Sequence, residues 1–216
     1  MSVITILAGC SHGAAADLYP VSIGNTWTYE VTEGSVIGTN AERIAAVASL
    51  SGGKQVTMTG SLIISGFQQH ATSYFFFGSD GSMTIPPNDP MTSLGWPSLP
   101  DNIIVPPLGA IQPGRSFVTA TNRPLNYLGK NTSERQSITL EGDGVSRITL
   151  PAGTYQATAV TITIVATLKG KNALTTMERM WFAPGVGLVK EQVDGLAPNG
   201  RPGTELTEEL ESFKHG

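Results

Sequence analysis

Few residues of this 216-residue sequence have the types and spacing that catalysis requires. Residues 9–13, Gly-Cys-Ser-His-Gly, match the letters of the G-x-S-x-G elbow, in which a serine is exposed to attack a carbonyl carbon. That elbow has to lie between a strand and a helix, whereas this stretch overlaps a site of N-terminal processing described below. The three histidines, His12, His70 and His215, are far apart and show no metal-ligand spacing. The sequence therefore predicts neither a serine nucleophile nor a histidine-bound metal.

Carboxylates are the remaining groups that could carry chemistry. Asp80, Glu141 and Asp143 fall at predicted hairpin turns, where acidic side chains cap backbone N–H groups, and they offer too few oxygens for calcium. An acidic run near the C-terminus is typical of a solvated strand edge, where charge discourages aggregation; it comprises Glu205, Glu208, Glu209 and Glu211. The sequence places no two acids to face one cleft, as a glycosidase requires. We expect a protein that is not an enzyme and that uses no metal or cofactor.

The composition points to many short strands joined by tight turns. Charged residues make up 14% of the chain, whereas glycine (25 residues), proline (14) and threonine (24) are abundant. Threonine suits a half-exposed pleated surface, and glycine and proline suit turns. The net charge of −4 and the scattered positions of the 13 Lys and Arg residues exclude a basic surface for nucleic acid. No stretch reaches the roughly 18 apolar residues of a membrane-spanning helix.

Alternating side chains predict the strands themselves. Apolar residues alternate with threonines over 159–168, and residues 26–31 alternate in the same way, as expected for an antiparallel sheet with one packed face. Other strand-like segments are 54–64, 71–77, 136–141, 145–150, 175–183, 187–193 and 204–213, the last of which could also be a short helix. Residues 41–50 are ambiguous because their alanines favour a helix.

Glycine and proline mark the connections. Residues 79–81 (Ser-Asp-Gly) and 142–144 (Gly-Asp-Gly) predict tight hairpins, and residues 184–187 predict a third. Eight of the fourteen prolines fall in 86–113, so this stretch cannot be a central strand.

Weak sequence similarities between two parts of the chain suggest a duplicated meander. Residues 21–27 echo residues 111–117, and further similarities follow in the same order. The halves would be 19–85 and 108–216, joined by a proline-rich segment at 86–107, and residues 41–50 would then form a strand. Chance similarity between two β-rich segments explains the echoes equally well. In either case we predict one all-β domain over 19–216.

Cys10, the single cysteine, ends a short apolar run. It has no partner for an internal disulfide, and Leu-Ala-Gly-Cys at 7–10 resembles the lipobox of bacterial lipoproteins. The resemblance implies a diacylglycerol thioether on Cys10 that anchors the chain to a membrane, and Ser11 implies sorting to the outer membrane. Residues 1–9 would be a signal-peptide remnant without its basic n-region, and 10–18 a lipidated tether. The alternative is an ordinary apolar N-terminus with an unrelated cysteine.

Two motifs resemble a group of bacterial envelope lipoproteins. The first is 19–29, Tyr-Pro-Val-Ser-Ile-Gly-Asn-Thr-Trp-Thr-Tyr. The second joins Leu-Pro-Ala-Gly-Thr-Tyr at 150–155 to Met-Trp-Phe-Ala-Pro-Gly-Val-Gly-Leu-Val-Lys at 180–190. The resemblance implies a curved antiparallel sheet, a half-barrel or barrel-like meander akin to periplasmic lipoprotein carriers, and no established activity. A β-sandwich is the alternative fold.

Residues within these motifs also have a structural explanation. Gly24, Gly153 and Gly187 are expected at positive φ, where a Cβ atom would clash. Trp27 and Trp181 are expected to be buried plugs whose indole N–H groups bond to carbonyls.

The strongest sign of a ligand is the run Tyr-Phe-Phe-Phe at 74–77, which puts aromatic rings on both faces of one strand. Both faces must then be covered, and Trp96 and Leu99 could supply the cover, either as a lid over an apolar cavity or as a permanent second layer. We take Phe75, Phe77, Trp96 and Leu99 as candidate ligand-lining residues. The predicted function is a non-catalytic envelope lipoprotein that binds a lipid, another apolar ligand or an envelope protein, with a cell-surface interaction or glycan-binding module as the alternative.

Overall fold

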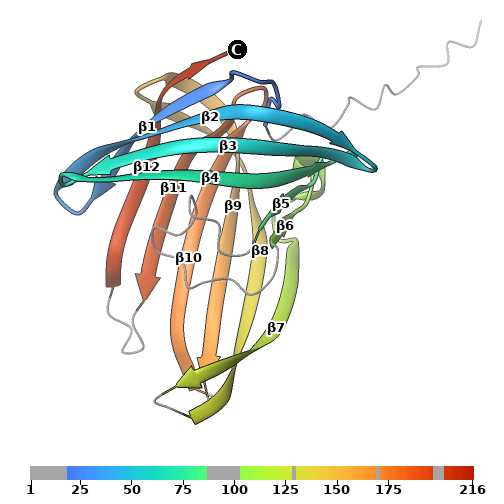
Figure 1. The fold of residues 1–216 in the computed structure, drawn as a ribbon, viewed down its shortest axis with the longest axis vertical. Helices are drawn as coiled ribbons and strands as arrows, with labels where there is room; N and C mark the ends of the chain where they lie inside the picture. Colours follow the sequence, from blue (N-terminus) through green and yellow to red (C-terminus); the bar gives the residue numbers. More distant parts are fainter. Residues whose placement is uncertain (1–18, 87–102, 128–129, 169–170, 197–201) are drawn as a thin grey trace, which may run out of the picture.

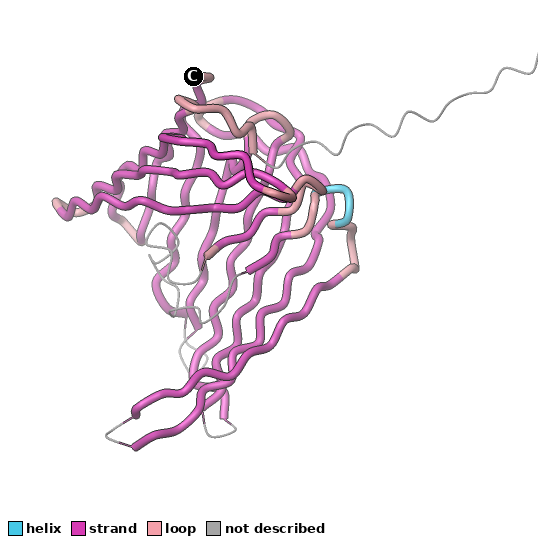
Figure 2. Tube along the Cα trace, turned by 45° about the vertical axis from the view of Figure 1, so that its right-hand side comes forward, coloured by secondary structure: helices cyan, strands magenta, loops and turns pink. Residues whose placement is uncertain are grey.

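The computed structural model describes residues 19–86, 103–127, 130–168, 171–196 and 202–216. Strands account for most of these residues, and one 3-10 turn is the only helical segment among them (Figure 2). The elements are β1 (Thr26–Glu33), β2 (Val36–Leu50), β3 (Gly53–Ile64), β4 (Phe67–Gly78), β5 (Met83–Ile85), β6 (Ile103–Val105), the turn Leu108–Ala110, β7 (Ser116–Tyr127), β8 (Lys130–Leu150), β9 (Gly153–Leu168), β10 (Lys171–Ala183), β11 (Gly187–Leu196) and β12 (Pro202–Lys214). In the described part of the chain, no helix is long and apolar enough to cross a membrane.

All twelve strands belong to one antiparallel sheet, in the order β6-β5-β4-β3-β2-β1-β12-β11-β10-β9-β8-β7. Neighbours in sequence pair as hairpins, and the pairing of β1 with β12 joins the two parts of the chain. The sheet stays open, with β6 and β7 at its edges. It bends so strongly that β2, β3 and β4 run across β8 to β12 (Figure 1). The curved all-β sheet is therefore confirmed, and it is one sheet rather than the two of a sandwich.

The core fills the space between these crossing parts. Buried and less buried side chains alternate along β1, where Trp27, Tyr29 and Val31 all point inward. In β9, Ile162 and Ile164 do the same, as the alternation at 159–168 predicted. Burial of side chains of this size contributes about 1.5–3 kcal/mol each. The two crossing parts of the sheet are thus held together mainly by apolar contact.

The segment 41–50 forms the second part of β2, so the ambiguity is resolved in favour of a strand. Arg43 pairs with Thr26 of β1 on one side and with Thr59 of β3 on the other. Pairing with β3 along the whole segment, and with β1 as far as Arg43, outweighs the helix propensity of the alanines, which is small for each residue. The proposed duplication remains a prediction.

The hairpin predicted at 142–144 is wrong. Strand β8 runs without interruption from Lys130 to Leu150, and these residues form a β-bulge opposite β9. Because β8 is paired with β7 and β9, the extra residue is absorbed as a bulge, with Gly144 at φ +89°. Glu141 and Asp143 are therefore strand residues and do not cap a turn.

The turn at 79–81 is confirmed. The carboxylate of Asp80 accepts hydrogen bonds from the backbone N–H of Ser82 (3.0 Å) and from its hydroxyl (2.6 Å). Both bonds favour the charged form and lower the pKa of Asp80. Within the proline-rich stretch, Ile103–Val105 forms only the short edge strand β6, as the lack of backbone donors predicts. Segment 87–102 lies outside the described residues.

Candidate functional site

The structure describes two of the four candidate lining residues. Phe75 and Phe77 are half-buried on β4 and pack against the main core, while Tyr74 is 57% exposed on the other face. The Phe77 ring meets the Tyr19 ring edge-on, with centroids 6.0 Å apart. Trp96, Leu99 and Cys10 lie outside the described residues. Whether Trp96 and Leu99 cover the aromatic strand therefore stays a prediction.

A cavity of about 480 Å³ opens next to Phe77. Its apolar lining comes from Tyr19, Val21, Leu50 and Phe77, and Lys54 is the one charged residue among the described residues that line it. The rest of the lining comes from the ends of β2, β3 and β4 and the turns that follow β2 and β4, namely Ser49, Gly52, Gly53, Gly78, Ser79 and Gly81. This volume is in the range of small-molecule sites. The cavity includes Phe77 but not Phe75.

The wall formed by Tyr19 is held by contacts between residues 19–29 and residues 180–190. The indole N–H of Trp27 donates to the carbonyl oxygen of Val186 (2.6 Å), and the hydroxyl of Tyr29 donates to that of Leu188 (3.1 Å). Tyr19 itself packs on Trp27 and against Gly187, which has a φ of +97°. The structural explanation of Trp27 and Gly187 is thus confirmed. Gly24 and Gly153 also have positive φ, and Trp181 is buried as predicted.

A cluster of three glutamates lies on the inner face of the curved sheet, and the sequence patterns did not predict it. Glu178 of β10 is 1% exposed and Glu208 of β12 is 5% exposed. The partly buried Glu191 of β11 stands directly opposite Glu208 in the strand register. We call these three residues the carboxyl belt. The prediction that Glu208 lies on a solvated edge is wrong, because β12 is a central strand that pairs with β1 and β11.

The positions of Glu208 and Glu191 in the alternating patterns of their strands could have predicted their burial. Glu208 lies between Leu206 and Leu210, which are two positions away on either side and are buried. Glu191 lies in the same way between Val189 and Val193. In a strand, residues i, i+2 and i+4 share a face. Each glutamate therefore occupies a position on the inward, apolar face.

Few polar groups compensate the carboxyl belt. The amide Nδ2 of Asn40 donates to Oε2 of Glu208 (3.2 Å) and to Oε1 of Glu42 (3.3 Å). The carboxyl group of Glu178 is hydrogen-bonded to that of Glu191, and among the described residues no other group satisfies its oxygens. No Lys, Arg or His side chain is buried among those that the structure describes. A charged carboxylate in such a place is costly, because buried charges need a partner or a hydrogen-bond network.

The pKa values of all three glutamates in the belt are raised, and burial is the main cause. Burial, followed by the negative charges of Glu208 and Glu42, raises the pKa of Glu191 to about 8. Burial raises the pKa of Glu208 to about 7, although the hydrogen bond from Asn40 partly opposes the shift. Burial, followed by the charge of Glu191, raises the pKa of Glu178 well above its usual range. The belt is therefore at least partly protonated at neutral pH.

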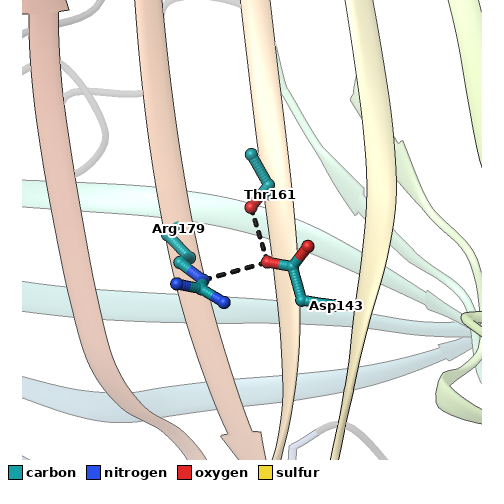
Figure 3. A network of polar contacts seen from close by, with 3 residues as sticks. All are labelled: Asp143, Thr161 and Arg179. Carbon is teal, nitrogen blue, oxygen red and sulfur yellow. Dashed lines mark hydrogen bonds and ion pairs between the residues drawn. The ribbon is translucent and has the colours of Figure 1, made fainter. Parts of the chain in front are cut away.

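The outer face of the sheet carries a different polar network (Figure 3). The carboxylate of Asp143 accepts hydrogen bonds from the Thr161 hydroxyl (2.7 Å) and from Nε of Arg179 (2.9 Å). Arg179 also lies over the Trp181 ring, 5.0 Å from its centroid. A shallow groove of about 320 Å³ runs beside these residues and is also lined by Asp194. In the described part of the chain, no group of three His, Cys, Asp or Glu residues is arranged to hold a metal ion.

No protein-family model and no curated protein matches this sequence. Two crystal structures share its fold. One is described as a lipoprotein from Parabacteroides distasonis, with a TM-score of 0.61 and 17% identity over 93% of this chain and 99% of that chain. The other is described as an exported protein with a YmcC-like fold from Bacteroides fragilis, with a TM-score of 0.61 and 14% identity over 93% of this chain and 100% of that chain. At these identities the likeness concerns the fold alone.

Proposed function

We propose that this chain is an exported, non-enzymatic lipoprotein of a bacterial cell envelope, anchored in the outer membrane through Cys10, and that its curved sheet binds an apolar ligand. The observation that carries the binding proposal is the cavity of about 480 Å³ beside Tyr19 and Phe77. Its four large apolar side chains, set among glycines and serines with one lysine, suit a ligand with a hydrophobic part and a polar group.

The anchoring proposal is supported by sequence and by likeness. Residues 7–10 read as a lipobox, and the described domain begins at Tyr19, a short tether away from Cys10. The two crystal structures with this fold are described as a lipoprotein and as an exported protein. Envelope attachment would place the cavity outside the cytoplasm, where hydrophobic molecules need a carrier to cross water.

Lipidation is tested by expressing the full chain in a Gram-negative host supplied with an alkyne analogue of palmitate. The wild-type chain is expected to take up the label and to fractionate with outer membranes. Cys10→Ser should lose both properties, whereas the neighbouring Ser11→Ala should keep the label. Mass spectrometry that finds an unmodified thiol on Cys10 of the wild-type chain would refute the anchor.

Ligand binding is tested with a fluorescent fatty acid titrated against the purified protein. Phe77→Asp, which puts a charge into the cavity, is expected to weaken binding by at least tenfold. Phe67→Asp is the matched control, because Phe67 lies on the same strand but is 57% exposed and away from the cavity. Equal weakening by both variants, or a wild type that binds no fatty acid and yields no lipid in organic extracts, would count against a carrier.

A surface interaction module is the second candidate, and the groove of the outer face favours it. Asp143 and the Trp181 ring hold Arg179 in place beside Asp194, so donors and acceptors of fixed position are available to a glycan or a protein. Arg179→Met should abolish capture of such a partner by the immobilised protein without altering fatty-acid binding.

A further inference from the structure

The charge at the cavity beside Phe77 indicates which polar group its ligand carries. Lys54 is the one charged residue among the described residues of the lining. It lies two positions before the buried Val56 in β3 and therefore on the same, inward face of the strand. In the strand register it stands opposite Phe77 of β4 and Ser49 of β2, which line the cavity as well. The ammonium group is thus placed at the cavity and not on the outer face of the sheet.

Lys54 has no counter-ion within the part of the chain that the structure describes. Its ammonium group forms no ion pair or side-chain hydrogen bond there, whereas that of Lys190 lies 2.6 Å from the carboxylate of Glu209. The acidic residue of the adjacent turn, Asp80, does not line the cavity, and its carboxylate is engaged by the N–H and the hydroxyl of Ser82. A compact positive charge is therefore left for a group that enters the cavity.

Apolar surface lies beside this charge. Tyr19 is 7% exposed and is held edge-on by the rings of Trp27 and Phe182, so it forms a fixed wall. Leu50 of the same lining is 50% exposed, and Phe77 is half-buried. A hydrocarbon chain that covers this surface removes it from water, which is favourable in proportion to the area covered. The volume of about 480 Å³ is in the lower half of the range of small-molecule sites, which suits one chain and not two.

We infer that the ligand of this cavity is a single-chain carboxylic acid, whose carboxylate pairs with Lys54 while its hydrocarbon chain lies against Tyr19 and Phe77. The inference rests on the proposed function, because it names the chemical class of the ligand for the same cavity. One carboxylate matches one ammonium group in charge. A phosphate monoester carries about −1.5 to −2 near neutral pH and would leave negative charge uncompensated beside a single lysine.

Displacement of a neutral fluorescent probe, N-phenyl-1-naphthylamine, from the purified wild-type chain at pH 7.5 tests the inference. Decanoic acid, decanol and decylamine have the same chain length and differ in the head group. Decanoate is expected to bind about three- to fivefold more tightly than decanol, the effect of one ion pair that stays open to water, and decylamine more weakly than decanol. Equal affinities for decanoate and decanol would overturn the inference and leave the proposed function standing, whereas a chain that binds neither would contradict both.

Variants of Lys54 assign the preference to its charge. Lys54→Met keeps an apolar stem without the charge, so decanoate should lose its advantage while decanol binds within twofold of its affinity for the wild type. Lys54→Glu should reverse the order and favour decylamine over decanoate. Lys214→Met is the matched control, because Lys214 is likewise exposed but does not line the cavity, and it should keep the wild-type preference. A preference that survives Lys54→Met, or that both methionine variants lose equally, refutes the role of Lys54.

Two further measurements examine the head group. Decyl phosphate is expected to bind no more tightly than decanoate, and tighter binding that depends on Lys54 would assign the cavity to phosphate esters and overturn the carboxylic acid. Raising NaCl from 0.05 to 0.5 M should reduce the advantage of decanoate over decanol, because salt screens an ion pair at an exposed residue. An advantage that does not change with salt would contradict the ion pair.

Discussion

Tyr19 lies so close to Gly187 that a Cβ atom on the glycine would stand 2.7 Å from a carbon of the tyrosine ring. The contact joins the segment before β1 to the turn before β11, and the Trp27 and Tyr29 hydrogen bonds to the same hairpin flank it. Residues 19–29 and residues 180–190 are therefore two sides of one packed unit.

Gly187→Ala tests this packing. The new methyl group would meet the ring and would also be held at a φ of +97°, so we expect a loss of roughly 2–5 kcal/mol in the free energy of unfolding. Gly185→Ala is the control, because Gly185 also has positive φ but nothing lies within 4 Å of its Cβ position; it should cost about 1–2 kcal/mol. Urea denaturation measures both, and equal losses would contradict the contact.

Trp27→Phe is expected to reduce the free energy of unfolding by about 2–4 kcal/mol. The variant leaves a cavity at a fully buried position and removes the hydrogen bond to the Val186 carbonyl. Tyr74→Phe, at an exposed position, should change stability by no more than about 0.5 kcal/mol. A small effect of Trp27→Phe would show that the indole N–H contributes little.

The pH dependence of stability follows from the carboxyl belt. Glutamate has a pKa of 4.5 when unperturbed, against about 7 for Glu208 and about 8 for Glu191 in the folded chain. Below pH 4.5 both states hold these protons; above it only the folded state does, up to about pH 7 for Glu208 and about pH 8 for Glu191. Folding then takes up protons, so stability falls as pH rises, by about 1.4 kcal/mol per pH unit for each proton. Urea midpoints at pH 5, 6, 7 and 8 measure this fall.

Glu208→Gln should reduce that dependence and raise the free energy of unfolding at pH 8.5 by about 1–3 kcal/mol, because a neutral amide replaces a buried carboxylate. Glu209→Gln removes only a partly exposed ion pair with Lys190 and should cost less than about 1 kcal/mol at any pH. A Glu208→Gln variant less stable than the wild type at pH 8.5 would argue that the carboxylate has a counter-ion.

Asp143→Ala is expected to cost less than about 1 kcal/mol, although Asp143 bonds to both Thr161 and Arg179. The pair with Arg179 is partly exposed, with 49% of the arginine side chain and 26% of the aspartate side chain accessible to solvent. Exposed pairs of this kind contribute little and are weakened by salt. Thermal unfolding in 0.05 and 0.5 M NaCl is the measurement, and a loss above 2 kcal/mol would indicate that the bulge depends on Asp143.

The sequence predicted the strands well wherever one face of the sheet is buried and the other is exposed to solvent. In β9, threonines alternate with isoleucine and valine, and the observed burial follows that pattern. It could not distinguish a bulge from a hairpin at Gly142–Gly144, because Gly-Asp-Gly suits both and the outcome depends on the neighbouring strands. It likewise predicted the aromatic strand of Phe75 and Phe77, with an apolar cavity as one option, but not that Tyr19 and the ends of β2 and β3 would line the cavity beside Phe77.

The carboxyl belt was missed for a related reason. Charged residues near a chain end were interpreted as an edge, yet the position of β12 within the sheet depends on its pairing with β1. Alternation within β12 puts Glu208 on the same face as Leu206 and Leu210. The prediction of a solvated edge rested instead on the high number of glutamates in this segment. The phase of a charged residue within a strand is thus more informative than the local density of charge.

The pairing of β1 with β12 also has a consequence for the timing of folding. The two strands at the centre of the sheet come from opposite ends of the domain, so one side of β1 has no neighbour until residues 202–214 have been synthesised. Contacts of such long sequence separation form slowly. The two meanders, β1 to β6 and β7 to β12, can therefore be joined into one sheet only after the last strand has been made.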